Sequence, residues 1–210
     1  MEREQDYQVA EVFESLQGEG YNVGMAAVFL RFGRCNLACP WCDTAHDVYG
    51  TLDGDAVVAR VTAFRAKNLI VTGGEPFLQE GLGALLARFK ALGYWIGIET
   101  NGLLAPPQEW LRHIDYMAVS PKARVAERYL DTQMVRRADE VRIVVDGDVR
   151  AFCVAMRLRI RAAHYFLSPC ERDGVHNIEE TVRLLGVLNH GWRDGKWLLS
   201  LQTHKLGGFA

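Results

Sequence analysis

The chain lacks the features that mark membrane, secreted and nucleic-acid-wrapping proteins. No apolar run of about eighteen residues, the length of a membrane-spanning helix, occurs in its 210 residues. The N-terminal stretch MEREQDYQVAEVF is charged and has no apolar core, unlike a signal peptide. The 24 Lys and Arg are outnumbered by 26 Asp and Glu, and a net charge of −2 does not favour wrapping of nucleic acid. We therefore expect a cytoplasmic protein that binds neither a membrane nor a nucleic acid.

Basic residues gather in one part of the chain only. We interpret this arginine-rich region as a solvated helix face, because runs of like charge are usually found on solvated surfaces. It consists of Arg136, Arg137, Arg142, Arg150, Arg157, Arg159 and Arg161.

The sequence also lacks a linker or a break in composition, so we expect a single domain spanning residues 1–210. Strand-like and helix-like segments alternate along it, which indicates βαβ crossovers and a parallel sheet. The expected strands cover 28–32, 68–72, 94–100, 115–120, 140–145, 164–167 and 197–201, and the expected helices cover 53–67, 76–92, 149–161 and 178–188. Because a full barrel needs eight strands, we predict an α/β fold: an incomplete TIM-like barrel of about six parallel strands.

Polar and glycine-rich segments follow the expected strands. In open or closed parallel α/β sheets, ligands bind where the carboxyl ends of the strands meet. The segments that follow the strands are the cysteine-rich stretch 35–44, Gly-Gly-Glu-Pro at 73–76, Asn-Gly at 101–102, Ser-Pro-Lys at 120–122 and Ser-Pro-Cys-Glu at 168–171. We expect these segments to form one site.

Three of the five cysteines lie within eight residues, in CNLACPWCDT. Five is an odd number for a disulfide framework, and the cytosol keeps thiols reduced, so the group Cys35, Cys39 and Cys42 indicates metal or redox chemistry. Thiolates select zinc, copper(I) or iron–sulfur clusters.

A fourth ligand is not obvious from the sequence. His46 would complete a C-x3-C-x2-C-x3-H zinc site, which needs four protein ligands. Cys153 lies on the apolar stripe of an expected helix, a position typical of a core residue. Cys170 follows a strand and stays a candidate ligand.

Three cysteines on a four-iron cluster leave one iron open to a substrate or cofactor. The spacing C-x3-C-x2-C with Trp41 before the last cysteine resembles the radical S-adenosylmethionine superfamily, and Gly-Gly-Glu-Pro at 73–76 is similar to its second motif. A longer set of motifs resembles the 7-carboxy-7-deazaguanine synthase family over nearly the whole chain. It comprises LQGEG at 16–20, CDT at 42–44, TGGEP at 72–76, ETNG at 99–102, SPK at 120–122 and QTHK at 202–205.

The resemblance implies a radical-mediated ring contraction of 6-carboxy-5,6,7,8-tetrahydropterin to 7-carboxy-7-deazaguanine, with loss of ammonia, in queuosine and 7-deazapurine biosynthesis. It implies three cofactors: a 4Fe-4S cluster, S-adenosylmethionine and Mg²⁺. It further implies an external one-electron reductase of the flavodoxin or ferredoxin type and a homodimer.

The resemblance also assigns residues to the site. Cys35, Cys39 and Cys42 would ligate iron, and Thr44 would ligate magnesium. The residues expected at S-adenosylmethionine are Trp41, Asp43, Gly73, Gly74, Glu75, Ser120, Lys122, Ser168, Pro169, Cys170 and Glu171. The residues expected at the pterin are Leu16, Gln17, Gly18, Glu19, Arg31, Thr72, Glu99, His204 and Ala210. Arg31 is expected inside the barrel or near its mouth, where its guanidinium can clamp a carboxylate.

Two other functions remain open from the residues. A zinc-binding interaction module would use Cys35, Cys39, Cys42 and His46, but it leaves the Gly-Gly-Glu-Pro segment unexplained. An activase that installs a glycyl radical on a partner enzyme would share the radical chemistry. Segments 16–20 and 202–205 favour a small pterin site over a docked polypeptide.

Overall fold

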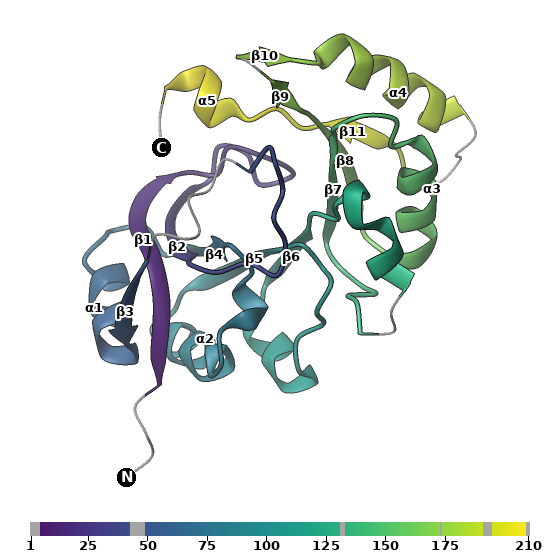
Figure 1. The fold of residues 1–210 in the computed structure, drawn as a ribbon. Helices are drawn as coiled ribbons and strands as arrows, with labels where there is room; N and C mark the ends of the chain where they lie inside the picture. Colours follow the sequence, from purple (N-terminus) through teal and green to yellow (C-terminus); the bar gives the residue numbers. More distant parts are fainter. Residues whose placement is uncertain (1–4, 43–48, 131–132, 173, 191–194, 209–210) are drawn as a thin grey trace.

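A sheet of nine strands forms the framework of the molecule (Figure 1). The computed structural model describes residues 5–42, 49–130, 133–172, 174–190 and 195–208. The order of the strands in the sheet is β11-β8-β7-β6-β5-β4-β2-β1-β3, and a separate hairpin joins β9 to β10. The strands are β1 (Asp6–Leu16), β2 (Ala26–Phe32), β3 (Gly50–Asp53), β4 (Asn68–Gly73), β5 (Trp95–Thr100), β6 (Tyr116–Val119), β7 (Glu140–Val145), β8 (His164–Pro169), β9 (Glu171–Arg172), β10 (Val175–His176) and β11 (Trp197–Leu199).

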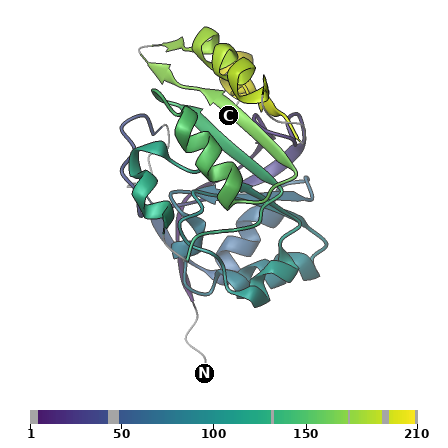
Figure 2. The same ribbon diagram turned by 90° about the vertical axis from the view of Figure 1, so that its right-hand side faces the viewer.

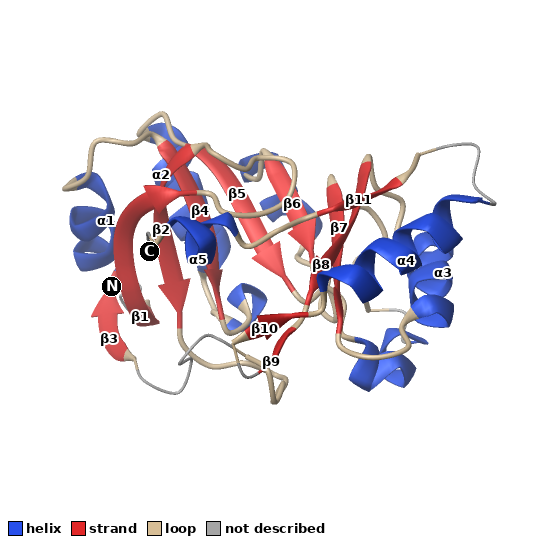
Figure 3. Cartoon of the chain, turned by 90° about the horizontal axis from the view of Figure 1, so that it is seen from above, coloured by secondary structure: helices blue, strands red, loops and turns tan. Residues whose placement is uncertain are grey.

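Seven of the nine strands, from β11 to β2, pair in parallel. Strand β1 is antiparallel to both β2 and β3 and extends the sheet on one side. Viewed from above, the strands curve around a central space and leave it open on one side (Figure 3). The predicted α/β partial barrel is therefore confirmed, with seven parallel strands where about six were predicted.

Four helices cover the outer side of this curved sheet: α1 (Gly54–Thr62), α2 (Leu82–Ala91), α3 (Arg150–Arg159) and α4 (Ile178–His190) (Figures 1 and 2). A fifth, α5 (Thr203–Gly207), lies on the inner side, and the 3-10 helices are η1 (Pro76–Leu78), η2 (Gln108–His113) and η3 (Ala123–Leu130). Among the described residues, none of these helices combines the length and the apolar character that crossing a membrane requires.

Two apolar clusters lie between the sheet and its helices. One joins α1 and α2 to β2, β4 and β5, and the other joins α3 and α4 to β7 and β8. Successive side chains of a strand point to opposite faces. In β2, Val28, Leu30 and Phe32 therefore point outward into the core, while Phe29 and Arg31 face the inner space. Cys153 is fully buried in the second cluster, which confirms its expected place in the core.

Several boundaries differ from those expected. No strand was expected over 6–16, but this segment forms β1, and Leu16 is its last residue. The helix expected at 76–92 is two pieces, because Gly81 adopts a left-handed φ of 74° before α2 begins. The helix expected at 53–67 begins after β3 and ends at Thr62.

The interpretation of the arginine-rich region as a solvated helix face is wrong for Arg142. This residue lies in β7 and is only 6% exposed, because its side chain points into the inner space of the sheet. Its neighbours Val141 and Ile143 point outward into the core.

Candidate functional site

One cavity of about 490 Å³ occupies the inner space at the carboxyl ends of the parallel strands. Most of the expected site residues line it, so the segments that follow the strands do meet, as predicted. The lining residues from the expected site are Leu16, Gln17, Gly18, Glu19, Arg31, Cys35, Cys39, Trp41, Cys42, Thr72, Gly73, Gly74, Glu99, Ser120, Lys122, Ser168, Pro169, Cys170, Glu171 and His204.

Four of the expected site residues are not among these lining residues. Asp43, Thr44 and Ala210 lie outside the described residues, as does His46, the candidate fourth zinc ligand. Glu75 is described, but it does not belong to the described cavity lining.

The three clustered thiols lie on one side of the cavity, which we call the cysteine side and define by Cys35, Cys39 and Cys42. Cys42 is exposed, and the other two are half-buried. Burial raises the pKa of both Cys35 and Cys39, and the neighbouring cysteines raise it further, while Lys122 acts to lower that of Cys39. Binding of a metal would remove these thiol protons.

Three clustered thiols are a donor set suited to an iron–sulfur cluster. Among the described residues, no three His, Cys, Asp or Glu side chains surround one common position. In a four-iron cluster each thiolate binds a different iron, so the thiols need not converge on one point.

Polar contacts fix the cysteine-containing loop to the ends of β5 and β7. The side chain of Asn101 donates a hydrogen bond of 2.6 Å to Asn36 Oδ1. The indole of Trp41 donates to Asp146 Oδ2 at 2.9 Å, and Arg124 forms an ion pair with the same oxygen. The loop is thus tied to two strand ends before any ligand binds.

Gly73 and Gly74 permit the close approach of β4 to the start of the cysteine-containing loop. Gly73 has a φ of 127°, and a Cβ there would collide with the backbone of Phe32. A Cβ at Gly74 would collide with the carbonyl of Arg34. Both glycines also line the cavity, so they leave backbone groups open to a ligand.

Glu75 lies fully buried behind the cavity wall. Its carboxylate accepts hydrogen bonds from Thr100 Oγ1 at 2.8 Å, from the N–H of Asn101 at 2.8 Å and from the N–H of Phe77 at 3.2 Å. Burial raises the pKa of Glu75, against the lowering effect of these bonds. In this arrangement the carboxylate positions the end of β5, and the expected direct contact with an ammonium group stays a prediction.

Beside the cysteine side lie hydroxyl and ammonium groups suited to a polar cofactor. Lys122 Nζ lies 2.6 Å from Ser120 Oγ and 5.2 Å from the centre of the Trp41 ring. Burial lowers the pKa of Lys122, against the effect of the nearby Cys39. Ser168 Oγ is buried on the cavity wall and has no hydrogen-bond partner among the described residues. A ligand that filled the cavity would supply that partner.

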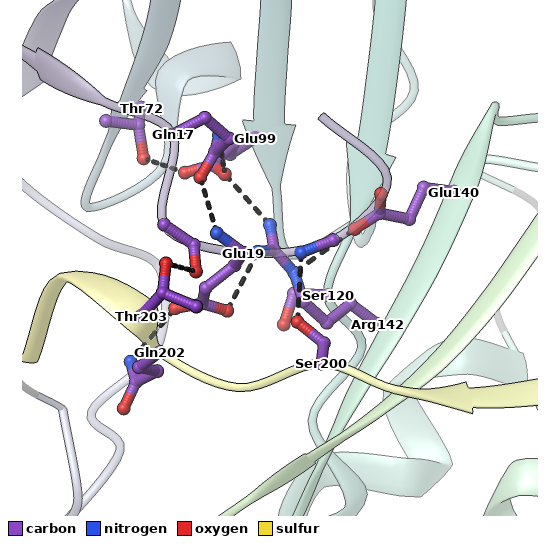
Figure 4. A network of polar contacts seen from close by, with 12 residues as sticks. Gln17, Glu19, Thr72, Glu99, Ser120, Glu140, Arg142, Ser200, Gln202 and Thr203 are labelled. Carbon is purple, nitrogen blue, oxygen red and sulfur yellow. Dashed lines mark hydrogen bonds and ion pairs between the residues drawn. The ribbon is translucent and has the colours of Figure 1, made fainter. Parts of the chain in front are cut away.

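A second part of the cavity lining, which we call the acidic side, consists of Gln17, Glu19, Glu99 and Arg142 (Figure 4). Gln17 Nε2 donates to Glu99 Oε1 at 3.2 Å, and Thr72 Oγ1 donates to Glu99 Oε2 at 2.9 Å. Burial acts to raise the pKa of Glu99, but the charge and hydrogen bond of Arg142 outweigh it and leave that pKa below its usual range.

Arg142 contacts three carboxylates from different segments. Its Nη1 lies 2.8 Å from Glu19 Oε2, its Nη2 lies 2.8 Å from Glu99 Oε1, and its Nε lies 3.3 Å from Glu140 Oε1. Burial acts to lower the pKa of Arg142, but these carboxylates raise it well above the usual value. The guanidinium is therefore always charged.

The C-terminal segment closes the cavity against the β1–β2 connection. Thr203 donates to the carbonyl of Gly18 from both its N–H and its hydroxyl, and Gln202 donates to Glu19 Oε1 at 2.9 Å. A Cβ at Gly18 would collide with the ring of His204, so the glycine lets this ring reach the cavity.

Arg31 lies on the cavity wall, as expected from its place in β2. Its Nε lies 2.6 Å from Glu11 Oε1 on the neighbouring strand, and its guanidinium carbon lies 5.6 Å from the centre of the Phe13 ring. The side chain is 25% exposed, which leaves it accessible to a ligand.

Sequence reasoning gave no site role to Arg142, Glu140 or Glu11, and it placed Asn101 and Gln202 in site segments without assigning either one a contact. Asn101 lies in the ETNG motif and Gln202 in the QTHK motif, and membership of these motifs was the feature of the sequence that could have indicated a role in the site. The other three carry no local signal, because each functions through residues far away in the chain.

Known proteins resemble this chain in sequence and in fold. The profile of the Radical SAM superfamily matches residues 30–125, which include the three clustered cysteines and Gly73–Gly74. The 7-carboxy-7-deazaguanine synthase of Neisseria meningitidis serogroup B is 52% identical over 204 residues, covering 96% of this chain and 93% of the relative. That of Haemophilus influenzae is 48% identical over 205 residues, covering 98% of this chain and 95% of the relative. The crystal structure of QueE from Escherichia coli has the same fold, with a TM-score of 0.64, 24% identity and 93% of each chain covered.

The site and its fold define a radical S-adenosylmethionine enzyme, whose cofactors are a 4Fe-4S cluster and S-adenosylmethionine. Within that superfamily, the chain belongs to the 7-carboxy-7-deazaguanine synthase family. The resemblance drawn from the motifs is confirmed, and it replaces both the zinc-module and the glycyl-radical activase alternatives.

Proposed function

We propose that the chain converts 6-carboxy-5,6,7,8-tetrahydropterin to 7-carboxy-7-deazaguanine with loss of ammonia, acting as a carbon–nitrogen lyase. The observation that carries the proposal is that the cysteine side and the acidic side border the same cavity. One side suits an iron–sulfur cluster and the other suits the nitrogen-rich edge of a pterin, so cofactor and substrate would lie next to each other.

Cys35, Cys39 and Cys42 would hold the cluster, and the backbone of Gly73 and Gly74 would border S-adenosylmethionine. When bound, the cluster and S-adenosylmethionine supply a radical that removes a hydrogen atom from C6 of the pterin. The protein's contribution is binding, orientation and the exclusion of water.

Lys122 and Ser120 offer a positive charge and a hydroxyl to the methionine carboxylate or the ribose. Ser168 and the neighbouring Pro169–Glu171 segment offer further contacts to the same ligand, and Trp41 offers an aromatic face near adenine. Asp43 belongs to the same expected contact set.

On the substrate side, the carboxylate of Glu99 and the amide of Gln17 offer an acceptor-rich surface to the amino and ring N–H groups of the pterin. Arg31 would pair with the pterin carboxylate, exchanging Glu11 for a ligand with the same charge. Leu16, Thr72 and His204 would complete the enclosure, together with the carboxyl group of Ala210.

Magnesium, the physiological electron donor and the oligomeric state are finer parts of the proposal. Thr44 would bind Mg²⁺ beside the substrate, because Mg²⁺ takes oxygen ligands and retains several waters. A flavodoxin or ferredoxin would reduce the cluster, and the protein would act as a homodimer in the cytoplasm. Chelation of Mg²⁺ should slow turnover and leave the cluster spectrum unchanged, and Thr44→Val should reproduce that loss.

The decisive experiment is an anaerobic incubation of the reconstituted protein with S-adenosylmethionine, a reductant and the carboxypterin. Mass analysis should find 7-carboxy-7-deazaguanine, and the ammonia released should match it one to one. Formation of methionine and 5′-deoxyadenosine without the deazaguanine would keep the radical chemistry and disprove the proposed substrate.

A further inference from the structure

Arg142 connects segments that lie far apart in the sequence. It extends from β7 and reaches Glu19 in the β1–β2 connection, Glu99 at the end of β5 and Glu140 at the start of its own strand. It is only 6% exposed, although it lines the cavity. Figure 4 shows the guanidinium among these carboxylates.

Each nitrogen of the guanidinium has a different partner. Nη2 donates a hydrogen bond to Glu99, Nη1 donates one to Glu19, and Nε forms an ion pair with Glu140, so each nitrogen faces a carboxylate of the protein. The carboxylate of Glu140 also accepts hydrogen bonds from Tyr116 and from the N–H of Tyr21. These two hydrogen bonds hold the Glu140 carboxylate in place, and Glu140 in turn orients the guanidinium of Arg142.

The carboxylate of Glu99, one of those around Arg142, lines the cavity and accepts hydrogen bonds on both of its oxygens. Oε1 accepts from Gln17 and Arg142, and Oε2 accepts from Thr72. The plane of the carboxylate is therefore set by three strands or connections at once, before a ligand enters.

The charged and titratable groups around Glu99 come from several elements. Besides the three clustered cysteines, those that line the same cavity are Glu11, Glu19, Arg31, Lys122, Arg142, Glu171, His204 and Lys205, and Glu140 and Tyr116 lie next to Arg142. Arg142 makes a direct ion pair with Glu99. Removing it would leave a half-buried carboxylate beside two others, which favours protonation.

We propose that Arg142 is the positioning residue for the substrate: it holds the Glu99 carboxylate charged and oriented toward the 2-amino and ring N–H groups of an aminopyrimidinone. Arg142 acts through Glu99 and not by contact with the ligand. The inference rests on the proposed function, since it concerns the same pterin. A charged carboxylate accepts an N–H group more strongly than a neutral one. Oε2 of Glu99, which accepts from Thr72, has a second acceptor position for such a group.

The test is a titration of 6-carboxy-5,6,7,8-tetrahydropterin into the protein carrying its cluster and S-adenosylmethionine, without reductant. Arg142→Gln should weaken pterin binding roughly 10- to 100-fold, the effect of losing a charged hydrogen-bonding partner. Glu99→Gln should lose a similar amount. In the double variant, Arg142→Gln should add less than about twofold, because the residue it acts through is already changed.

The pH dependence gives a second measurement. Glu99 in Arg142→Gln should take up a proton in a range where it stays ionised in the unaltered protein. The pterin affinity of the variant should therefore recover as the pH rises from mildly acidic to mildly basic. That of Glu99→Gln should show no such recovery.

Arg142→Lys keeps the positive charge and loses the planar fork of the guanidinium. Its pterin affinity should therefore depend on pH as in the unaltered protein but should be lower. It also serves if Arg142→Gln fails to fold. Arg150→Gln, an exposed arginine on α3, is the matched control and should bind the pterin normally. Affinity for S-adenosylmethionine and the cluster spectrum should be unchanged in all variants.

Full additivity of the Arg142 and Glu99 effects, or an equal loss of affinity for S-adenosylmethionine, would make Arg142 a structural residue and overturn the inference. Failure of the unaltered protein to bind the pterin would instead disprove the proposed function, so the two outcomes are distinct.

Discussion

The cysteine side and the acidic side border the same cavity but differ in how they are built. The cysteine side comes from one stretch of eight residues, Cys35 to Cys42, tied to the sheet by Asn101 and Asp146. The acidic side is assembled from three distant parts of the chain, the β1–β2 connection, β5 and β7, which meet at Arg142.

The two sides also differ in the charge that they carry before a ligand binds. Burial raises the pKa values of Cys35 and Cys39, so the thiols stay protonated until a metal displaces the protons. Arg142 holds the pKa of Glu99 low, so the acidic side is charged without any ligand. The cysteine side is completed by its cofactor, whereas the acidic side is complete in the folded chain.

The largest effect should come from the cysteine side. Cys39→Ala should remove one of three ligands and abolish stable iron binding, measured as iron content and visible absorption after anaerobic reconstitution. Cys170→Ala and Cys153→Ala are the controls and should retain the cluster, because the open-iron arrangement uses only three thiols. Complete loss of iron in either control would reveal a fourth protein ligand.

A smaller effect should come from Arg31, which lies between the two sides. Arg31→Lys should weaken pterin binding roughly 10- to 100-fold, because the ammonium cannot clamp a carboxylate with two hydrogen bonds. Calorimetric titration should show normal affinity for S-adenosylmethionine. Glu11→Gln is the matched control: it removes the partner on β1 and keeps the fork, so pterin affinity should not fall. Equal losses for both ligands would return Arg31 to a structural role.

A smaller effect again should follow from Gly18→Ala. The added methyl group would push against the ring of His204 and loosen the C-terminal segment from the acidic side. Pterin binding should weaken about two- to tenfold, the range expected from losing an uncharged hydrogen bond. Trypsin should cleave faster after Lys205. Gly186→Ala in α4, where an added methyl group meets nothing within 4 Å, should change neither measurement.

The smallest effect should be a pH dependence of stability. The folded-state pKa of Glu99 lies below its unfolded value, so its contribution is present above the unfolded pKa and is lost as the pH falls through the folded one. Denaturant titrations of the unaltered protein should therefore show falling stability toward acid pH. Glu99→Gln should lose less stability over the same range, and an identical slope for both would contradict the pairing with Arg142.

The sequence predicted most of the sheet because its strands bury both faces or alternate clearly, as in 28–32 and 68–72. It missed β1, since this strand lies near the edge of the sheet, where only Tyr7 and Val9 are fully buried and the apolar pattern is weak. It also joined η1 and α2 into one helix, because the leucine spacing continues across the left-handed Gly81.

The cysteine side could be predicted from the sequence because its chemistry depends on short-range spacing. Three cysteines within eight residues are typical of a metal or redox site. Arg142 could not, since an arginine between Val141 and Ile143 has the same local pattern whether its charge meets water or three carboxylates.

The amino-acid sequence alone was enough to predict the class of chemistry, the parallel sheet and a ligand site at the carboxyl ends of its strands. The ion pairs of that site became visible only in the folded chain. Burial of an ion is tolerated only when opposite charges lie close to it. The partners of Arg142 are Glu19, Glu99 and Glu140, and the order of the strands in the sheet brings the first two next to it. Pairings across such distances depend on how the strands assemble, which no local pattern in the chain records.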